Sequence, residues 1–387
     1  MEKIGIGMIG CGGMGRNVTG AVLKQDERLE LRSLVDPDER SIEAARKELN
    51  PEASVYDSPE AMYAADGIDW VMVASWNCFH KEHVLSALAA GKHIFCQKPL
   101  TTTLADALEV YRAGLAGGGL FSMGFNLRRS PHYRRLKEIL SDGAIGEIVS
   151  MEFNETLEFN HGGYIMGDWR RLRENSGTHV LEKCCHDIDL VNWMTESRAS
   201  RVASFGGLNF FTPENISHQE RVGSSANGVT AFQGWGGAHN LNPFTSDKDI
   251  IDNQVAILEF ENGIRASFHT NCCAGITERR MYIVGTEGAI RADLITEKIE
   301  VRRVGWEARW EVEDTRGAGT HGGGDEVLAQ ELADCMIHGT EPEVGVAEGV
   351  EAATTCFVID EAMDSGRVVD ASPYWKKVDE VRAAGGG

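Results

Sequence analysis

A glycine-rich turn near the amino terminus constrains the fold of this chain more than any other feature. Gly10, Gly12 and Gly15 follow an apolar run at residues 4–9, and a helical pattern over residues 16–24 follows them. Between a strand and a helix, such glycines permit a tight turn, the close approach of a pyrophosphate, and close helix packing. The pattern predicts a dinucleotide-binding turn. Its predicted contact residues are Gly10, Gly12, Gly13, Met14 and Gly15.

An acidic residue follows the second predicted strand, where such folds bind a ribose. Residues 30–35 are strand-like and end at Asp36, about 20 residues beyond the turn. A carboxylate there accepts hydrogen bonds from ribose hydroxyls and repels a 2′-phosphate, so the sequence favours NAD over NADP. The segment 36–38 could also cap the helix predicted at residues 39–49, and the two roles are compatible.

Strands and helices continue to alternate up to residue 124. Strand patterns at 69–75 and 93–96 alternate with helical patterns at 81–90 and 104–113. This alternation is typical of a parallel, doubly wound sheet. We therefore predict an α/β Rossmann domain that binds NAD over residues 1–124.

The pattern changes in the second part of the chain. Strands at 255–260 and 264–270 are joined by a hairpin signal, and more strands follow without helices between them. This order predicts an α+β domain over residues 125–387, with a large, mainly antiparallel open sheet. A free sheet face could join copies of the chain into a dimer or tetramer, and the C-terminal helices could pack back on the first domain.

Residues 211–248 form an unusually long loop, rich in Gly, Asn, Ser and His. Long loops inside compact domains are often lids or oligomer arms. A disordered insertion is the alternative. The interleaved aromatic residues Phe232, Trp235 and Phe244 favour packing.

Charge and cysteine usage limit the partners. With 59 acidic and 38 basic residues the net charge is −21, which argues against nucleic acid and anionic membranes. No apolar run approaches the roughly 18–20 residues of a membrane span, and no export signal is evident. Nine cysteines without such a signal favour free thiols in the cytoplasm. Zinc-type spacings are absent around Cys184, Cys185 and His186, so we predict no metal site.

Lys98 is placed to do chemistry. It follows the strand at 93–96, at the edge of a doubly wound sheet where ligands bind. Oxidation of an alcohol by a nicotinamide cofactor needs a base near the hydroxyl. A solvated surface lysine would satisfy the position equally well.

The motifs taken together resemble one family. They are Gly10–Gly15, Asp36, Asn77-x-x-His80, Gly91-Lys-His, Gln97-Lys98-Pro99, Gly143-x-Ile-Gly146 and Glu182-x-x-x-His186. In these the chain resembles the Gfo/Idh/MocA oxidoreductases (glucose–fructose oxidoreductase, inositol dehydrogenase, rhizopine catabolism) over nearly its whole length. The resemblance implies that Lys98 and His186 are catalytic, and that Glu182 orients the imidazole or binds a neighbouring hydroxyl. Further expected cofactor contacts are Ser75, Asn77, His80 and Gln97.

Two departures from the family bear on the substrate. Gln97 replaces the usual glutamate, and Glu182 the usual aspartate. Cations gather between Arg170 and Lys183, so a sugar with an anionic group would fit, although solvated cations are equally compatible. The predicted substrate-binding residues are Lys98, Asn126, Arg170, Lys183 and His186.

Three functions follow from the resemblance. The first is NAD-dependent oxidation or reduction of a hydroxyl on a sugar, sugar derivative or cyclitol. The second is an NAD-dependent glycosidase, which oxidises the sugar at C3, eliminates the aglycone, adds water and returns the hydride. The third is a non-catalytic dinucleotide-binding sensor, which the presence of Lys98 and His186 disfavours.

Overall fold

The computed structural model describes residues 3–316 and 319–385, and contacts divide them into two compact units. The first unit runs to Ser130 and takes in a later segment ending at Ala353 and the chain from Trp375 onward. The second unit starts at Pro131 and includes Thr354–Tyr374. The first unit thus extends past residue 124 and also takes in segments from the C-terminal part of the chain.

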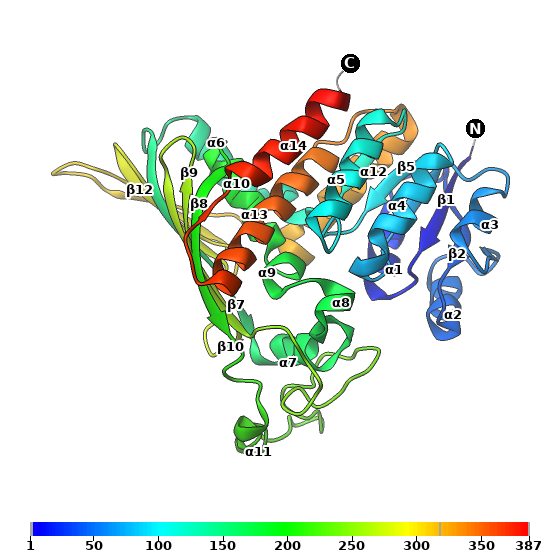
Figure 1. The fold of residues 1–387 in the computed structure, drawn as a ribbon, viewed down its shortest axis with the longest axis horizontal. Coiled ribbons are helices and arrows are strands. Elements are labelled where there is room, and N and C mark those ends of the chain that lie inside the picture. The colour runs from blue at the N-terminus through cyan, green and yellow to red at the C-terminus, as the bar shows by residue number, and fades with distance from the viewer. Residues whose placement is uncertain (1–2, 317–318, 386–387) are drawn as a thin grey trace. The chain divides into compact units, whose positions relative to one another are not determined.

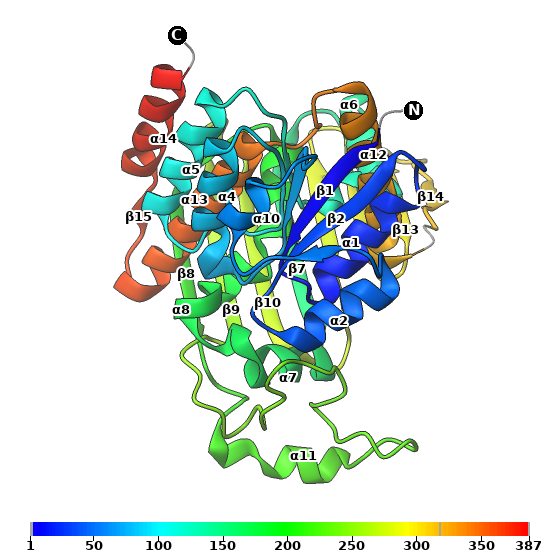
Figure 2. The same ribbon diagram turned by 90° about the vertical axis from the view of Figure 1, so that its right-hand side faces the viewer.

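A parallel sheet forms the centre of the first unit, in the order β3-β2-β1-β4-β5-β6. Figure 2 shows β1 and β2 side by side. The order runs outward in both directions from β1, which confirms the predicted Rossmann fold. The strands are β1 (Ile4–Ile9), β2 (Leu29–Val35), β3 (Ser54–Val55), β4 (Trp70–Val73), β5 (His93–Cys96) and β6 (Phe121–Met123). The helices between them are α1 (Gly13–Leu23), α2 (Glu39–Glu48), α3 (Pro59–Tyr63), α4 (His80–Ala89) and α5 (Leu104–Ala116).

One helix from the end of the chain completes this core. α12 (Gly324–His338) buries Leu328, Leu332 and Met336 in the same apolar cluster as Ile6 and Val22 of β1 and α1. Two 3-10 turns, η1 (Asn77–Phe79) and η2 (Asn126–Arg129), follow β4 and β6. Since all six strands are parallel, the residues that follow β1, β4, β5 and β6 meet at one edge of the sheet.

A nine-stranded sheet forms the core of the second unit, in the order β14-β13-β12-β11-β7-β10-β9-β8-β15. Figure 1 labels five of these strands: β7, β8, β9, β10 and β12. All neighbours are antiparallel except β7 and β10, so the predicted mainly antiparallel sheet is confirmed. The strands are β7 (Ile148–Glu158), β8 (Ala199–Gly207), β9 (Asn253–Phe260), β10 (Arg265–Ala274), β11 (Arg280–Gly285), β12 (Gly288–Asp293), β13 (Lys298–Arg303), β14 (Trp310–Asp314) and β15 (Val369–Asp370).

The two faces of this sheet differ. Buried and exposed positions alternate along β9, β10 and β11, as expected when one face is covered. The covering helices include α6 (Pro131–Ser141) and α10 (Cys185–Thr195). The other face carries exposed apolar side chains, among them Phe205, Val255 and Ile257. Two long helices, α13 (Val346–Ser365) and α14 (Ser372–Gly385), finish the chain.

The segment 211–248 is anchored by part of its aromatic residues, although Trp235 and much of the segment are exposed. Phe211, Phe232 and Phe244 are buried in one apolar cluster with Ile165 and Met166 of α7 (Phe159–Gly167). The ring centroids of Phe232 and Phe244 lie 5.1 Å apart in an edge-to-face arrangement. A short helix, α11 (Ser217–Val222), extends from this cluster (Figures 1 and 2).

Candidate active site

The glycine-rich turn contains two kinds of glycine: those packed against neighbouring backbone and those with open space beside them. Gly10 has φ +91°, and a Cβ there would lie 2.5 Å from the backbone of Ala74. A Cβ on Gly15 would lie 2.2 Å from the Gly10 carbonyl oxygen, so both positions require glycine. A Cβ on Gly12 or Gly13 would meet nothing within 4 Å. The open side of the turn therefore lies at the N-terminus of α1, where backbone N–H groups suit a pyrophosphate.

Asp36 is tied to this turn. Its Oδ2 accepts a hydrogen bond from the Cys11 backbone N–H at 2.6 Å, and its Oδ1 accepts one from the Asp38 N–H at 2.8 Å. Two hydrogen bonds fix the carboxylate where β2 ends, beside the phosphate turn. This placement suits the predicted contact with a ribose.

His80 has a different environment from the one predicted. Its ring is fully buried, with Nδ1 2.8 Å from the Pro99 carbonyl oxygen and Nε2 3.1 Å from the Ser75 carbonyl oxygen. Burial lowers the pKa of His80 to about 4, so the ring is neutral at pH 7. The ring lies between the loop after β4 and the loop after β5, and as a neutral imidazole it donates its single N–H to one of these two carbonyls.

The other predicted residues of the first unit lie around the same sheet edge. Ser75 Oγ is 2.9 Å from His83 Nδ1, and Asn77 is buried in η1. Gln97 Oε1 accepts a hydrogen bond from the Lys98 N–H at 3.1 Å, so an amide serves where the family usually has a carboxylate. Lys98 is half-buried at the end of β5, and Met14 is exposed in the first turn of α1.

Asn126 has partners that the sequence patterns did not reveal. Its side-chain amide donates to Asp325 at the start of α12, and Asp325 also lies 3.0 Å from His321 Nδ1. Nearly 200 residues separate Asn126 from Asp325 along the chain. No local pattern could have shown this contact.

The predicted catalytic pair of the second unit spans a helix break. Glu182 ends the short helix α9 (His179–Glu182), whereas His186 lies in the first turn of α10. The backbone leaves helical geometry at Cys184, with ψ 2°, so the two residues do not lie on one regular helix. Both side chains are buried. Cys184 and Cys185 are both buried, and both thiols are free.

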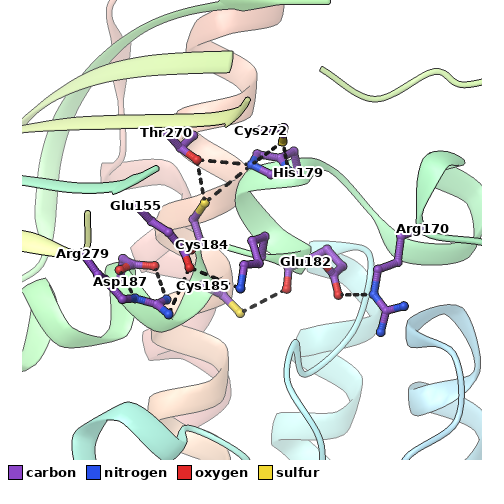
Figure 3. Close-up of polar contacts among 11 residues, drawn as sticks. Glu155, Arg170, His179, Glu182, Cys184, Cys185, Asp187, Thr270, Cys272 and Arg279 are labelled. Carbon is purple, nitrogen blue, oxygen red and sulfur yellow. Dashed lines mark hydrogen bonds and ion pairs between the residues drawn. The ribbon is translucent and has the colours of Figure 1, made fainter. Parts of the chain in front are cut away.

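Arg170 holds Glu182 (Figure 3). Arg170 Nε donates to Glu182 Oε1 at 2.9 Å, and Nη1 donates to the Tyr164 hydroxyl at 2.6 Å. The guanidinium also lies 4.3 Å from the ring centroid of Trp169. These contacts come from α7 and the 3-10 turn η3 (Trp169–Arg171), and they fix the carboxylate from one side.

Lys183 belongs to a buried ion network, of which Figure 3 labels Glu155, Asp187 and Arg279. Lys183 Nζ lies 3.2 Å from Glu155 Oε1, and Arg279 bridges Glu155 and Asp187 at 3.0 and 2.7 Å. Burial would raise the pKa of Glu155, but Arg279 and Lys183 outweigh it and lower that pKa. Burial raises the pKa of Asp187, which has a single cationic partner here. The sequence signal for Glu155 was its position between Phe153 and Leu157 on the inward face of β7.

The paired cations weaken the argument for an anionic substrate. Arg170 is paired with Glu182, Lys183 with Glu155, and Arg171 with Asp247. A substrate anion would have to compete with these carboxylates. The cation cluster is thus largely neutralised within the protein.

One group of possible metal ligands occurs among the described residues. Ligand atoms of Glu155, Cys184 and Asp187 lie within 4.8 Å of one another. Arg279 and Lys183 already balance the two carboxylates, and burial raises the pKa of the Cys184 thiol well above its usual range. The residues present therefore fit an ion-pair network better than a cation site.

Comparison with known proteins identifies the family. The model of an oxidoreductase family with an NAD-binding Rossmann fold, GFO/IDH/MocA, matches residues 4–125, and the GFO/IDH/MocA C-terminal domain matches residues 133–291. The chain belongs to the Gfo/Idh/MocA family. It is therefore an oxidoreductase that uses NAD, and the open turn at Gly12 and Gly13 fits that cofactor.

Several Gfo/Idh/MocA relatives cover most of the chain. The oxidoreductase YteT of Bacillus subtilis is 24% identical over 411 aligned positions, with 92% of this chain and 91% of that protein covered. Inositol 2-dehydrogenase of Acidiphilium cryptum is 28% identical, with 73% and 72% covered. The 2,7-anhydro-N-acetylneuraminate hydratase of Mediterraneibacter gnavus is 24% identical, with 76% and 68% covered.

A solved structure supports the family fold. Levoglucosan dehydrogenase in complex with NADH and levoglucosan superimposes with a TM-score of 0.78 at 18% identity, covering 96% of this chain and 100% of that one. At this identity the similarity concerns the fold.

Proposed function

We propose that this enzyme oxidises or reduces a hydroxyl group on a sugar, sugar derivative or cyclitol, and that Lys98 and His186 transfer the substrate proton. The observation that carries the proposal is the retention of both residues in the family motifs, with Glu182 held by Arg170 at 2.9 Å. The names of the relatives, which include inositol 2-dehydrogenase, support this substrate class.

The proposed roles follow from the positions of the side chains. Gly12, Gly13 and Asp36 would hold the cofactor, which supplies hydride transfer at the substrate carbon. Lys98 and His186 would accept the hydroxyl proton during oxidation and return it during reduction. Glu182, fixed by Arg170, would orient the imidazole or bind a neighbouring hydroxyl.

The test is an assay of the purified protein with NAD and a panel of sugars, cyclitols, uronates and aryl glycosides, with NADH and free aglycone followed in parallel. Growth of NADH with a neutral polyol supports the proposal. Lys98→Met and His186→Gln should each lower kcat by about 10²-fold or more. Unchanged activity in both variants would refute the assigned roles.

A glycosidase is the second candidate, and the hydratase among the relatives favours it. That relative acts through water addition by its name, so the family includes chemistry beyond net oxidation. For this chain, aglycone release without accumulation of NADH would identify the glycosidase and exclude a simple dehydrogenase.

We also propose a cytoplasmic homo-oligomer that forms through the open sheet. Phe205 and Ile257 are 69% and 64% exposed on adjacent strands, which a partner subunit would cover. No helix among residues 3–316 and 319–385 is long and apolar enough to cross a membrane. Light scattering of the wild type and of a Phe205→Glu, Ile257→Lys variant would test this assembly. A monomeric wild type would contradict it.

A further inference from the structure

The aromatic residues of segment 211–248 fall into two groups. Phe211, Phe232 and Phe244 are buried and hold the segment against α7. Trp235 remains 46% exposed, although it lies in the same segment. The exposed part of the indole offers an apolar surface on which a ligand can stack.

Trp235 rests on two rings of α7. Its ring stacks on His161 with centroids 4.0 Å apart and planes inclined by 21°, and it lies 5.9 Å from the Tyr164 ring. His161 and Tyr164 are three residues apart on the helix, so they share one face. Burial and the charge of Lys183 lower the pKa of His161 to about 2. The three rings therefore form an uncharged aromatic surface.

The protein backbone holds this indole in place on both sides. The Gly234 N–H donates to Asn160 Oδ1 at 3.2 Å, and the His239 N–H donates to Asp168 Oδ2 at 3.1 Å. Gly237 packs so tightly on Asp168 that a Cβ there would lie 1.9 Å from Oδ2. Trp235 is thus pre-positioned, which reduces the entropy lost when a ligand stacks on it.

Polar contacts connect the aromatic surface to the predicted catalytic carboxylate. The Tyr164 hydroxyl accepts from Arg170 Nη1 at 2.6 Å, and Arg170 Nε donates to Glu182 at 2.9 Å. Trp235 thus contacts Tyr164, Tyr164 contacts Arg170, and Arg170 contacts Glu182. Two side chains separate the indole from the carboxylate along this path, so a sugar ring stacked on Trp235 would be a different ring from one that contacts Glu182.

We propose that Trp235, His161 and Tyr164 form a carbohydrate subsite for a second ring, so that the substrate is a neutral glycoside larger than one sugar. A pyranose has an apolar face of C–H groups, which stacks on an aromatic plane, and hydroxyl groups at its rim, which would meet Tyr164 and Arg170. The pairing of Arg170 and Lys183 with carboxylates fits a neutral ligand. This inference rests on the proposed function, because it extends the same substrate site.

The test compares one-ring and two-ring ligands. The one-ring ligands are monosaccharides, and the two-ring ligands are their p-nitrophenyl glycosides and neutral disaccharides. Binding of each is measured by calorimetry in the presence of NAD, and turnover is measured in parallel. Trp235→Ala should weaken the binding of two-ring ligands at least tenfold, raise their KM similarly and leave kcat nearly unchanged. One-ring ligands should change less than twofold. Trp235→Phe keeps an aromatic plane and should retain most of the affinity.

Trp306→Ala is the matched control, because Trp306 is fully exposed between β13 and β14 and lies outside this surface. Two-ring binding that depends on Trp235 without any turnover would support the subsite and refute the proposed function. Turnover of single sugars with no effect of Trp235→Ala on any ligand would support the proposed function and refute the subsite. An oligomer that dissociates in Trp235→Ala, with two-ring binding unchanged, would instead assign Trp235 to a contact with a second copy.

Discussion

Arg170 and Glu182 form a largely buried ion pair, with Nε and Oε1 2.9 Å apart, in which the guanidinium also contacts Tyr164 and Trp169. The pair explains how a carboxylate can be kept in a buried position next to the break between α9 and α10. Arg170 is therefore already paired with a carboxylate of the protein itself. A buried ion pair fixes geometry only while both partners remain.

Removal of the arginine should therefore leave Glu182 without its main partner. Arg170→Met is expected to lower kcat/KM by about 10- to 100-fold, because a misplaced carboxylate no longer orients its neighbours. Arg170→Met should also lower the thermal stability, because it leaves the buried Glu182 charge without its partner. The double variant Arg170→Met, Glu182→Gln removes that charge and should recover part of this stability. Arg201→Met is the control, because Arg201 pairs with Glu259 on the exposed sheet. Equal effects in both arginine variants would contradict this role.

The buried network around Arg279 should dominate the stability of the second unit. Arg279→Met leaves Glu155 and Asp187 without their shared guanidinium and should lower the free energy of unfolding by about 3–5 kcal/mol. The neighbouring Arg280 pairs with the more exposed Glu152, so Arg280→Met should cost less than about 1 kcal/mol. Urea denaturation of the two variants measures the difference. Similar losses would mean that the network is not stabilising.

Asp360 should make stability depend on pH. Burial raises its pKa to about 7, so the folded state binds a proton that the unfolded state has lost above pH 4. The wild type therefore loses stability as pH rises from 5 to 7. Asp360→Asn keeps an acceptor for Thr178 and should gain roughly 2 kcal/mol relative to wild type between pH 5 and pH 8. The exposed Asp142→Asn should show no such trend; a parallel trend would locate the effect elsewhere.

His80 should position the loop that carries Lys98. Because burial lowers its pKa to about 4, the ring should stay neutral when titrated by NMR down to about pH 5. His80→Ala removes the hydrogen bond that the neutral ring donates to the Ser75 or Pro99 carbonyl and should destabilise the protein by about 1–3 kcal/mol. His80→Ala should also lower the activity, because the loop that carries Lys98 loses its support. His80→Gln retains a hydrogen-bond donor and should recover part of that activity. A ring that titrates near pH 6.5 would disprove the buried, neutral state.

Asp36 should determine the choice of cofactor. Its carboxylate is fixed by the Cys11 and Asp38 N–H groups, so its removal opens space and eliminates a charge that repels a 2′-phosphate. Asp36→Ala should lower the ratio of kcat/KM for NAD to that for NADP by about 10²-fold. The exposed Asp66→Ala should leave the ratio unchanged. An unaltered ratio in Asp36→Ala would show that other residues select the cofactor.

The sequence predicted best those features that depend on interactions between residues close together in the chain. The turn at Gly10–Gly15 requires glycines because of close contacts near one strand, one turn and one helix. Sequence spacing was therefore enough to identify it. The alternation of strands and helices likewise predicted the parallel sheet. His80 shows the limit of a motif: its position was predicted, whereas its partners Ser75 and Pro99 became visible only in the fold.

The sequence by itself determined the NAD-binding Rossmann unit, the mainly antiparallel second sheet and the family motifs that include Lys98, Glu182 and His186. Tertiary structure alone decided the partners of the charged side chains. Arg279 and Asp187 are 92 residues apart, and Asn126 and Asp325 are 199 apart. Such pairs form because a buried charge must find a partner wherever the fold provides one, and sequence spacing carries no record of that distance. For the same reason, the pairing of Arg170 with Glu182 and of Lys183 with Glu155 became visible only in the fold.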